Sequence, residues 1–218
     1  MRQTVRFLYR FSWPSWLIMA FFAAVILLGA VLTGVPRGTD NIFATYFVMY
    51  PMLIPMLTMI LSFSLCSCFL NVALSFGARR RDFFLSLQGV LLLDVLIGCA
   101  LAWLMACLPQ TLGWAGSNEI FSVQAFLEWA GGLYALMIFG EAALGCAVGL
   151  LLGRSRILGT VLVVLASLLS AGLFLVLTLS GILNLPPWLR PAAAAVSAGM
   201  AVGSEAFLWR SIRRQVVR

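Results

Sequence analysis

Three acidic side chains lie well inside long apolar runs of this sequence, where a carboxyl can do chemistry only at some cost. They are Asp94, Glu141 and Glu205. A charge at the centre of a bilayer costs about 2.5–3.5 kcal/mol, and no arginine lies within any of these runs. Each carboxyl must therefore be protonated, face water, or pair with a group from another segment. Asp94 and Glu141 are candidates for a polar path through the membrane.

Two interpretations of Glu141 stay open, because it lies nearest the middle of its run. It either faces such a path, or it makes a hydrogen bond between two helices. Glu205 lies five residues before Arg210 and can reach the membrane interface, so a merely interfacial position explains it.

Residues for most kinds of catalysis are missing. The chain has no histidine, and all fourteen of its basic residues are arginine. The absence of lysine excludes a Walker-type phosphate loop and a Schiff base, and the absence of histidine excludes Ser/His dyads and the usual zinc sites. The five cysteines lie in apolar runs, where a free thiol behaves as a small hydrophobe. We expect neither an enzyme nor a metal or cofactor site in this chain.

The stretch from Ser75 to Ser86 combines arginines with aromatic rings. Three consecutive arginines, Arg79, Arg80 and Arg81, would suffice to orient neighbouring helices, but a plain loop does not need Phe76, Phe83 and Phe84 as well. Exposed rings beside charges are typical of a docking surface. The sequence therefore predicts that this segment binds another protein.

Long apolar runs must position these groups. Spanning about 30 Å of hydrocarbon takes about 20 helical residues, and the chain is 63% hydrophobic and 10% charged. Six runs meet or nearly meet that length: Trp16–Val35, Tyr46–Leu74, Leu87–Leu108, Phe126–Leu152, Ile157–Leu177 and Ala192–Trp209. We predict a single all-α integral membrane domain, residues 1–218, with six transmembrane helices.

The arginines predict the orientation of these helices. Twelve of the fourteen fall before the first run, after the second, after the fourth or after the sixth, and only Arg37 and Arg190 fall on the other side. Short arginine-rich loops stay in the cytoplasm, so both termini are expected there. The net charge of +7 is explained by orientation and anionic lipid headgroups, and we expect no nucleic acid as a partner.

Two segments depart from plain spans. Arg2, Arg6 and Arg10 form one stripe with aromatic residues opposite, which predicts an amphipathic interfacial helix over residues 1–13 that Pro14 breaks. The fifth run continues through polar residues toward Pro186, so a short re-entrant hairpin over Thr178–Ala195 is one interpretation. A single long, tilted fifth helix is the other.

Small residues recur every four positions in two runs, which predicts closely packed helices. The two sets are Gly145, Gly149 and Gly153, and Ala195, Gly199 and Gly203.

The loop after the second run resembles the type-2 ABC export permease family. In that family a short helix of pattern Ser-Phe-Gly-x-x-Arg-x-x-Phe-Phe leads into the third span, and Ser75, Phe76, Gly77, Arg80 (or Arg79), Phe83 and Phe84 match it. The resemblance covers about a dozen residues in motif and the whole chain in layout. It implies that residues 75–86 form a cytoplasmic coupling helix.

The resemblance also implies partners. A separate ATP-binding cassette ATPase would hold ATP and Mg²⁺, and a second permease subunit, identical or different, would complete the transporter in a bacterial-type inner membrane. Phe76, Gly77, Arg79–Arg81, Phe83 and Phe84 would couple to the ATPase, while Asp94 and Glu141 would line the translocation path for a small molecule, peptide or lipid-like substrate. Two alternatives stay open: a substrate-binding membrane subunit of an ATP-driven importer, and a non-transporting membrane scaffold.

Overall fold

The protein is described by a computed structural model covering residues 2–35, 42–113, 130–182 and 188–214, and its regular elements in these ranges are all helices. The helices are α1 (Arg2–Leu32), α2 (Ile42–Ser67), α3 (Phe69–Ser75), α4 (Arg80–Thr111), α6 (Gly132–Arg154), α7 (Arg156–Ile182) and α8 (Leu189–Arg214). The predicted all-α class is confirmed. Five helical segments are long and apolar enough to cross a membrane: Thr4–Leu32, Met49–Ser75, Arg80–Leu108, Gly132–Gly153 and Leu189–Arg213. These segments indicate a multi-pass membrane protein.

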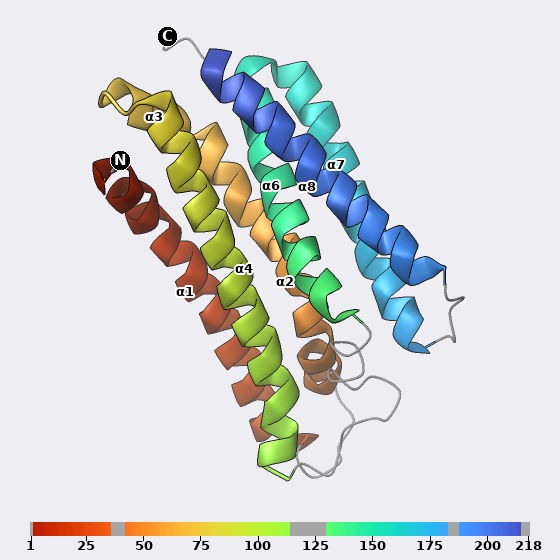
Figure 1. The fold of residues 1–218 in the computed structure, drawn as a ribbon. Helices are drawn as coiled ribbons and strands as arrows, with labels where there is room; N and C mark the ends of the chain where they lie inside the picture. Colours follow the sequence, from red (N-terminus) through yellow and green to blue (C-terminus); the bar gives the residue numbers. More distant parts are fainter. Residues whose placement is uncertain (1, 36–41, 114–129, 183–187, 215–218) are drawn as a thin grey trace.

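The long helices run side by side and alternate in direction, so that the two ends of the chain lie at the same end of the bundle (Figure 1). The short helix α3 and the junction between α6 and α7 lie at this end too. We call it the arginine end, because the arginines of α1, α3–α4, α7 and the end of α8 lie there. Helix α6 is central and packs against α2, α4, α7 and α8.

Glycines let α6 approach α2 backbone to backbone. A Cβ on Gly145 would overlap with the carbonyl oxygen of Met59, and one on Gly149 would overlap with that of Phe63. The close packing predicted from the α6 glycines is thus confirmed at these two positions, whereas Gly153 meets open space. Without side chains in the way, two helices gain van der Waals contact along several turns.

The second set of small residues behaves differently. Gly199 and Gly203 have nothing within 4 Å of the place where a Cβ would stand. The close contact of α8 comes from another position, because Gly140 of α6 lies against the backbone of Ser197. A Cβ added to Gly140 would lie 2.8 Å from the Ser197 carbonyl oxygen. No close packing occurs at Gly199 and Gly203 within the described part of this chain, and the spacing alone does not say whether their partner belongs to the same subunit.

A tyrosine supplies a hydrogen bond that a proline removes from the middle of α2. Pro55 has no N–H, so the carbonyl of Pro51 loses the hydrogen bond that a helix would normally supply. The Tyr134 hydroxyl of α6 donates to that carbonyl at 2.6 Å. In a similar way, the Tyr50 hydroxyl donates to the Met19 carbonyl of α1 at 2.6 Å. Buried backbone groups need such partners where no water can reach them.

The predicted break between an interfacial helix and the first span is wrong. Helix α1 continues through Pro14, since a proline removes one hydrogen bond and neighbouring elements can compensate. Rings on its first turns pack on protein: Phe11 stacks on Phe69 of α3 with centroids 4.3 Å apart, and Phe7 meets the same ring edge-on at 6.5 Å. Leu8 is fully buried. Residues 2–13 therefore form the start of α1 and pack into the bundle.

Of the two interpretations of Thr178–Ala195, the re-entrant hairpin is wrong for the described residues, and the long fifth helix agrees with them. Helix α7 continues to Ile182, and α8 begins at Leu189, so most of that range is regular helix. Residues 183–187 lie outside the described residues. The physical reason is that the first proline comes only at Pro186, and Pro191 lies in the first turn of α8, where its missing N–H would have no partner in any case.

Candidate functional site

The aromatic and arginine motif at Ser75–Ser86 lies at a sharp turn at the arginine end. Helix α3 ends at Ser75, Gly77 adopts a φ of +80°, and α4 begins at Arg80. The positive φ favours glycine, because a Cβ there would be strained. The predicted single helix over residues 75–86 is therefore wrong: this range holds the end of α3, a turn and the first turns of α4.

The three rings of the motif point in different directions. Phe76 is 81% exposed, whereas Phe83 is 0% exposed and belongs to the main core cluster. Phe84 is half-buried, with its ring 4.9 Å from that of Trp209 in α8. The expectation that both rings are exposed is wrong for Phe83, which faces the core, while Phe84 stays partly exposed. Phe83 begins the inward face that continues through Leu87.

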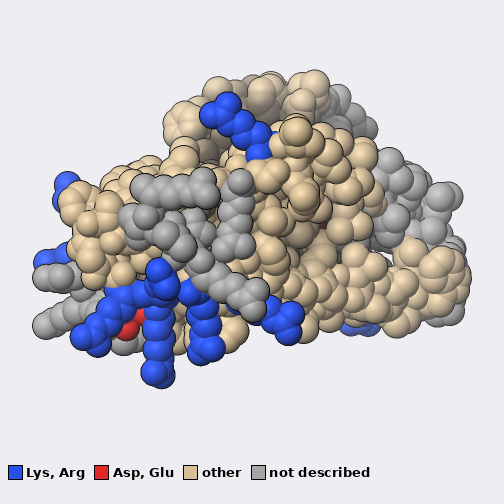
Figure 2. Space-filling view, turned by 90° about the horizontal axis from the view of Figure 1, so that it is seen from above, with Lys and Arg blue, Asp and Glu red and all other residues tan. Residues whose placement is uncertain are grey.

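The arginines divide in the same way. Arg80 donates from Nη1 to the carbonyl of Arg213 at 3.1 Å, and Arg213 in turn lies over the Trp209 ring at 3.8 Å. The last carbonyls of a helix lack partners within the helix, so Arg80 ties the turn to the end of α8. Arg79 and Arg81 are exposed. Figure 2 shows that arginines gather on this end of the molecule, with little acidic surface among them.

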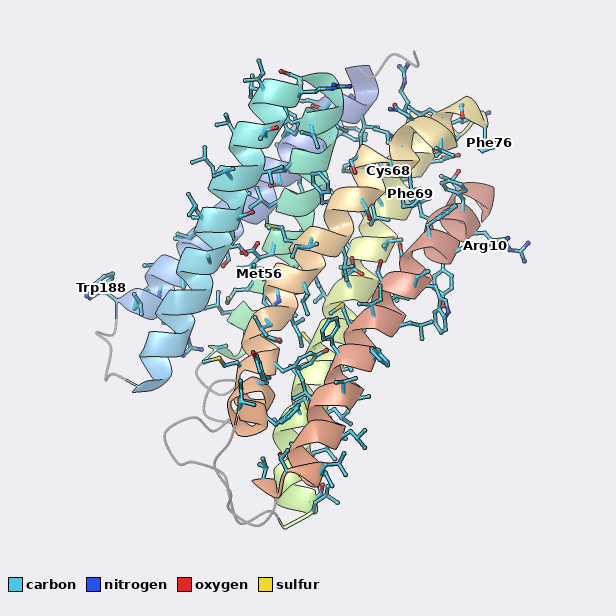
Figure 3. The ribbon with its side chains drawn as sticks, turned by 180° about the vertical axis from the view of Figure 1, so that it is seen from behind. Arg10, Met56, Cys68, Phe69, Phe76 and Trp188 are labelled. Carbon is cyan, nitrogen blue, oxygen red and sulfur yellow. The ribbon has the colours of Figure 1, made fainter. Side chains whose placement is uncertain are left out.

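The residues left for docking form a small exposed patch, which we call the docking tip: Phe76, Gly77, Arg79 and Arg81. In Figure 3, Phe76 lies at the outermost point of the arginine end, beyond Cys68 and Phe69. A large ring exposed to this extent beside two cations is suited to bind a partner with an apolar pocket and an acidic rim.

Asp94 occupies a buried polar cluster between three helices. Trp16 of α1 donates from Nε1 to Asp94 Oδ1 at 2.6 Å, and Ser62 of α2 donates from Oγ to Oδ2 at 3.4 Å. The Cys146 thiol of α6 donates to the Ser62 carbonyl at 3.3 Å. Both carboxyl oxygens thus have protein donors, and the side chain is only 7% exposed. This arrangement supports a structural role that joins α1, α2 and α4.

Glu205 is explained by a partner that the sequence did not suggest. Gln88 of α4 donates from Nε2 to Glu205 Oε2 at 2.6 Å, which links α4 to α8. The other oxygen, Oε1, is buried and has no hydrogen-bond partner in the described part of the chain.

Glu141, like Glu205, keeps one carboxyl oxygen without a partner among the described residues. It is 2% exposed, and the Ser170 hydroxyl of α7 supplies a hydrogen bond to its carboxyl. Its Oε2 is buried and lacks a partner among the described residues. A buried polar atom without a partner costs about 1–3 kcal/mol and calls for an explanation. Of the two acids assigned to a path, only Glu141 retains a carboxyl oxygen available to a ligand.

In comparisons with known proteins, no family model, no curated protein and no solved structure matches this chain. The family resemblance rests on the loop motif and the layout of the spans.

The Asp94 cluster gives a testable prediction. Asp94→Leu should lower the free energy of unfolding by about 1–3 kcal/mol, because it leaves the Trp16 N–H buried without an acceptor. Asp94→Asn keeps one oxygen for Trp16 and should be nearly silent. The measurement is thermal unfolding in detergent, followed with a thiol-reactive dye. This dye reaches the buried Cys66 and Cys146 only when the bundle opens.

A double-mutant cycle with Trp16→Phe provides the control, because removing both partners should cost less than the sum of the two single changes. Strictly additive effects would show that the short contact between Trp16 and Asp94 contributes nothing.

Proposed function

We propose that this protein is the transmembrane permease subunit of an ABC transporter, an exporter driven by a separate ATPase subunit. Six helices, α1, α2, α4, α6, α7 and α8, cross the membrane, with the arginine end and both termini in the cytoplasm. Positive charge retained on that side supports the orientation. The membrane is a bacterial-type inner membrane, and a second permease subunit completes the path for a small molecule, peptide or lipid-like substrate.

The observation that carries this proposal is the exposed ring of Phe76 at the docking tip. It lies at the end of the bundle that faces the cytoplasm in this orientation (Figure 3), and in the sequence it falls between the end of α3 and the exposed Arg79 and Arg81. Because Gly77 turns the backbone sharply and Arg80 ties the turn to α8, the ring stands on a fixed support. A force exerted on it by a moving ATPase would reach α4 and α8 directly.

Phe76→Ala should therefore weaken binding of the ATPase without changing the fold. Truncating a hot-spot aromatic typically costs 2 kcal/mol or more, so co-purification with the ATPase should fall more than about tenfold. Trp188→Ala is the matched control: Trp188 is 62% exposed, but it lies at the start of α8, away from the docking tip (Figure 3). Co-purification is measured from membranes that contain both subunits, and transport and ATP hydrolysis are followed in the same preparations.

If Phe76→Ala retains full ATPase binding and transport, the α3–α4 turn is only a topology signal. Loss of the ATPase in both variants would point to a general loss of folded protein instead, and thermal unfolding of each variant separates that case.

A further inference from the structure

A crevice opens between α2, α6 and α7. It has a volume of about 160 Å³ and is lined by Met59, Ile60 and Phe63 of α2, Gly145 and Val148 of α6, and Val163, Ala166 and Ser167 of α7. Helix α7 packs against α6 and α2, so it forms the outer wall of the crevice. Because drug-sized molecules occupy about 300–1,000 Å³, this space suits a section of alkyl chain.

Glu141 and Ser170 lie beyond the lining residues, past one end of the crevice. Glu141 precedes Gly145 by four residues, which places it on the same face of α6, about 6 Å further along the helix axis. Ser170 follows Ser167 by three residues on α7, and its hydroxyl binds the Glu141 carboxyl. Since α6 and α7 run in opposite directions, both residues extend the crevice walls the same way. The apolar space therefore leads toward a carboxyl with one oxygen, Oε2, that has no partner in the described residues.

Within the described part of the chain, no cation pairs with Glu141. The chain has no lysine and no histidine, and the nearest arginine along α6 is Arg154, about 20 Å away along the helix axis. Asp94 differs, because donors from α1 and α2 satisfy both of its oxygens. The complementary group for Glu141 is thus a positively charged donor brought in by a ligand.

We propose that this crevice binds a lipophilic amine, with its alkyl chain between α2 and α7 and its ammonium group paired with the Glu141 carboxylate. Met59, Phe63, Val148 and Ala166 contact the chain, and Ser170 orients the carboxyl. As a site for a transported substrate it rests on the permease function proposed above. As a binding site it can be tested on this chain alone, without an ATPase.

The test uses the purified chain in lipid nanodiscs and two photoreactive probes of equal length, a long-chain primary amine and the corresponding alcohol. The amine should label peptides of α2 and α7 that line the crevice. Glu141→Gln keeps the shape of the side chain but cannot pair with an ammonium. Because losing the partner of a desolvated charge pair weakens binding strongly, amine labelling should fall more than about tenfold, and alcohol labelling should change far less.

A second pair of variants tests the crevice itself. Ser167→Phe fills it and should reduce labelling by both probes, whereas Val164→Phe adds the same ring on an exposed face of α7 and should change neither. If Glu141→Gln labels with the amine as well as the wild type, or if labelling spreads over the lipid-facing sides of all helices, the proposal is overturned. Thermal unfolding of every variant confirms that it is folded. If Glu141→Gln does not fold, the labelling of Ser167→Phe decides whether the crevice is the binding site.

The two proposals can fail separately. Specific amine labelling in a chain that never couples to an ATPase would support the binding site and contradict the permease function. ATP-driven transport without amine labelling in the crevice would support the permease function and contradict the binding site.

Discussion

Gly145→Ala should destabilise the protein, although the same change in an ordinary helix is favourable. Alanine normally stabilises a helix by about 1 kcal/mol relative to glycine. At position 145, however, the new Cβ would overlap with the carbonyl oxygen of Met59 and lie 3.0 Å from its carbonyl carbon. Both are backbone atoms, so no side chain can rotate away, and α2 and α6 must separate. Overpacking of this kind costs about 1–3 kcal/mol.

Gly199→Ala is the matched control. Gly199 belongs to the same four-residue spacing of small residues in α8, but nothing lies within 4 Å of its added Cβ. Its unfolding temperature in detergent should be unchanged or slightly raised. Equal effects of the two substitutions would mean that α2 and α6 are not in backbone contact. A large loss at Gly199 alone would mean that a helix from outside this chain packs there.

The glycine pattern illustrates how far the sequence could predict the fold. Run lengths and hydrophobicity were sufficient to predict the long helices, because a membrane helix must satisfy its backbone internally whatever surrounds it. Spacing also predicted that Gly145 and Gly149 lie in a close contact. It could not show that Gly199 faces away from the bundle, since small residues have the same spacing whether or not a partner is present.

The structure of the loop motif was harder to predict than the long helices, because residues 75–86 match one continuous motif but contain the end of α3, a turn and the start of α4. A signal was available: Phe83, Leu87, Val90 and Asp94 recur at helical spacing, and all four are buried on one face of α4. That periodicity places Phe83 in the helix and leaves only Phe76 before the turn. The same argument would have shown that Pro14 does not separate α1 into two parts, since Leu8, Ser12 and Trp16 continue one buried stripe.

The buried acids could be found in the sequence, but their partners could not. Trp16 and Asp94 lie 78 residues apart, and Gln88 and Glu205 lie 117 apart. Which donor meets which acid depends on how the helices pack, and that depends on contacts spread over the whole bundle. Only the packed bundle shows that donors satisfy Asp94 and leave Glu141 half satisfied.

The first turn of α4 gives the prediction with the largest expected effect on stability. Phe83→Ala should lower the free energy of unfolding by about 3–5 kcal/mol, the usual range for removing a buried phenylalanine. The ring is 0% exposed and lies in the core cluster with Leu8 of α1, Leu70 of α3 and Leu208 of α8. Its loss would leave a cavity where these helices converge at the arginine end.

Phe76→Ala, seven residues earlier, removes the same atoms from a ring that is 81% exposed, so its stability should change by less than about 0.5 kcal/mol. The thiol-reactive dye reports both: Cys68 is exposed and reacts in the folded protein, while Cys66 and Cys146 react when the bundle unfolds. Phe83→Leu should recover much of the loss, because leucine refills most of the space. If Phe83→Ala unfolds at the wild-type temperature but loses the ATPase, then Phe83 belongs to the docking surface and the inward face of α4 begins later than the structure places it.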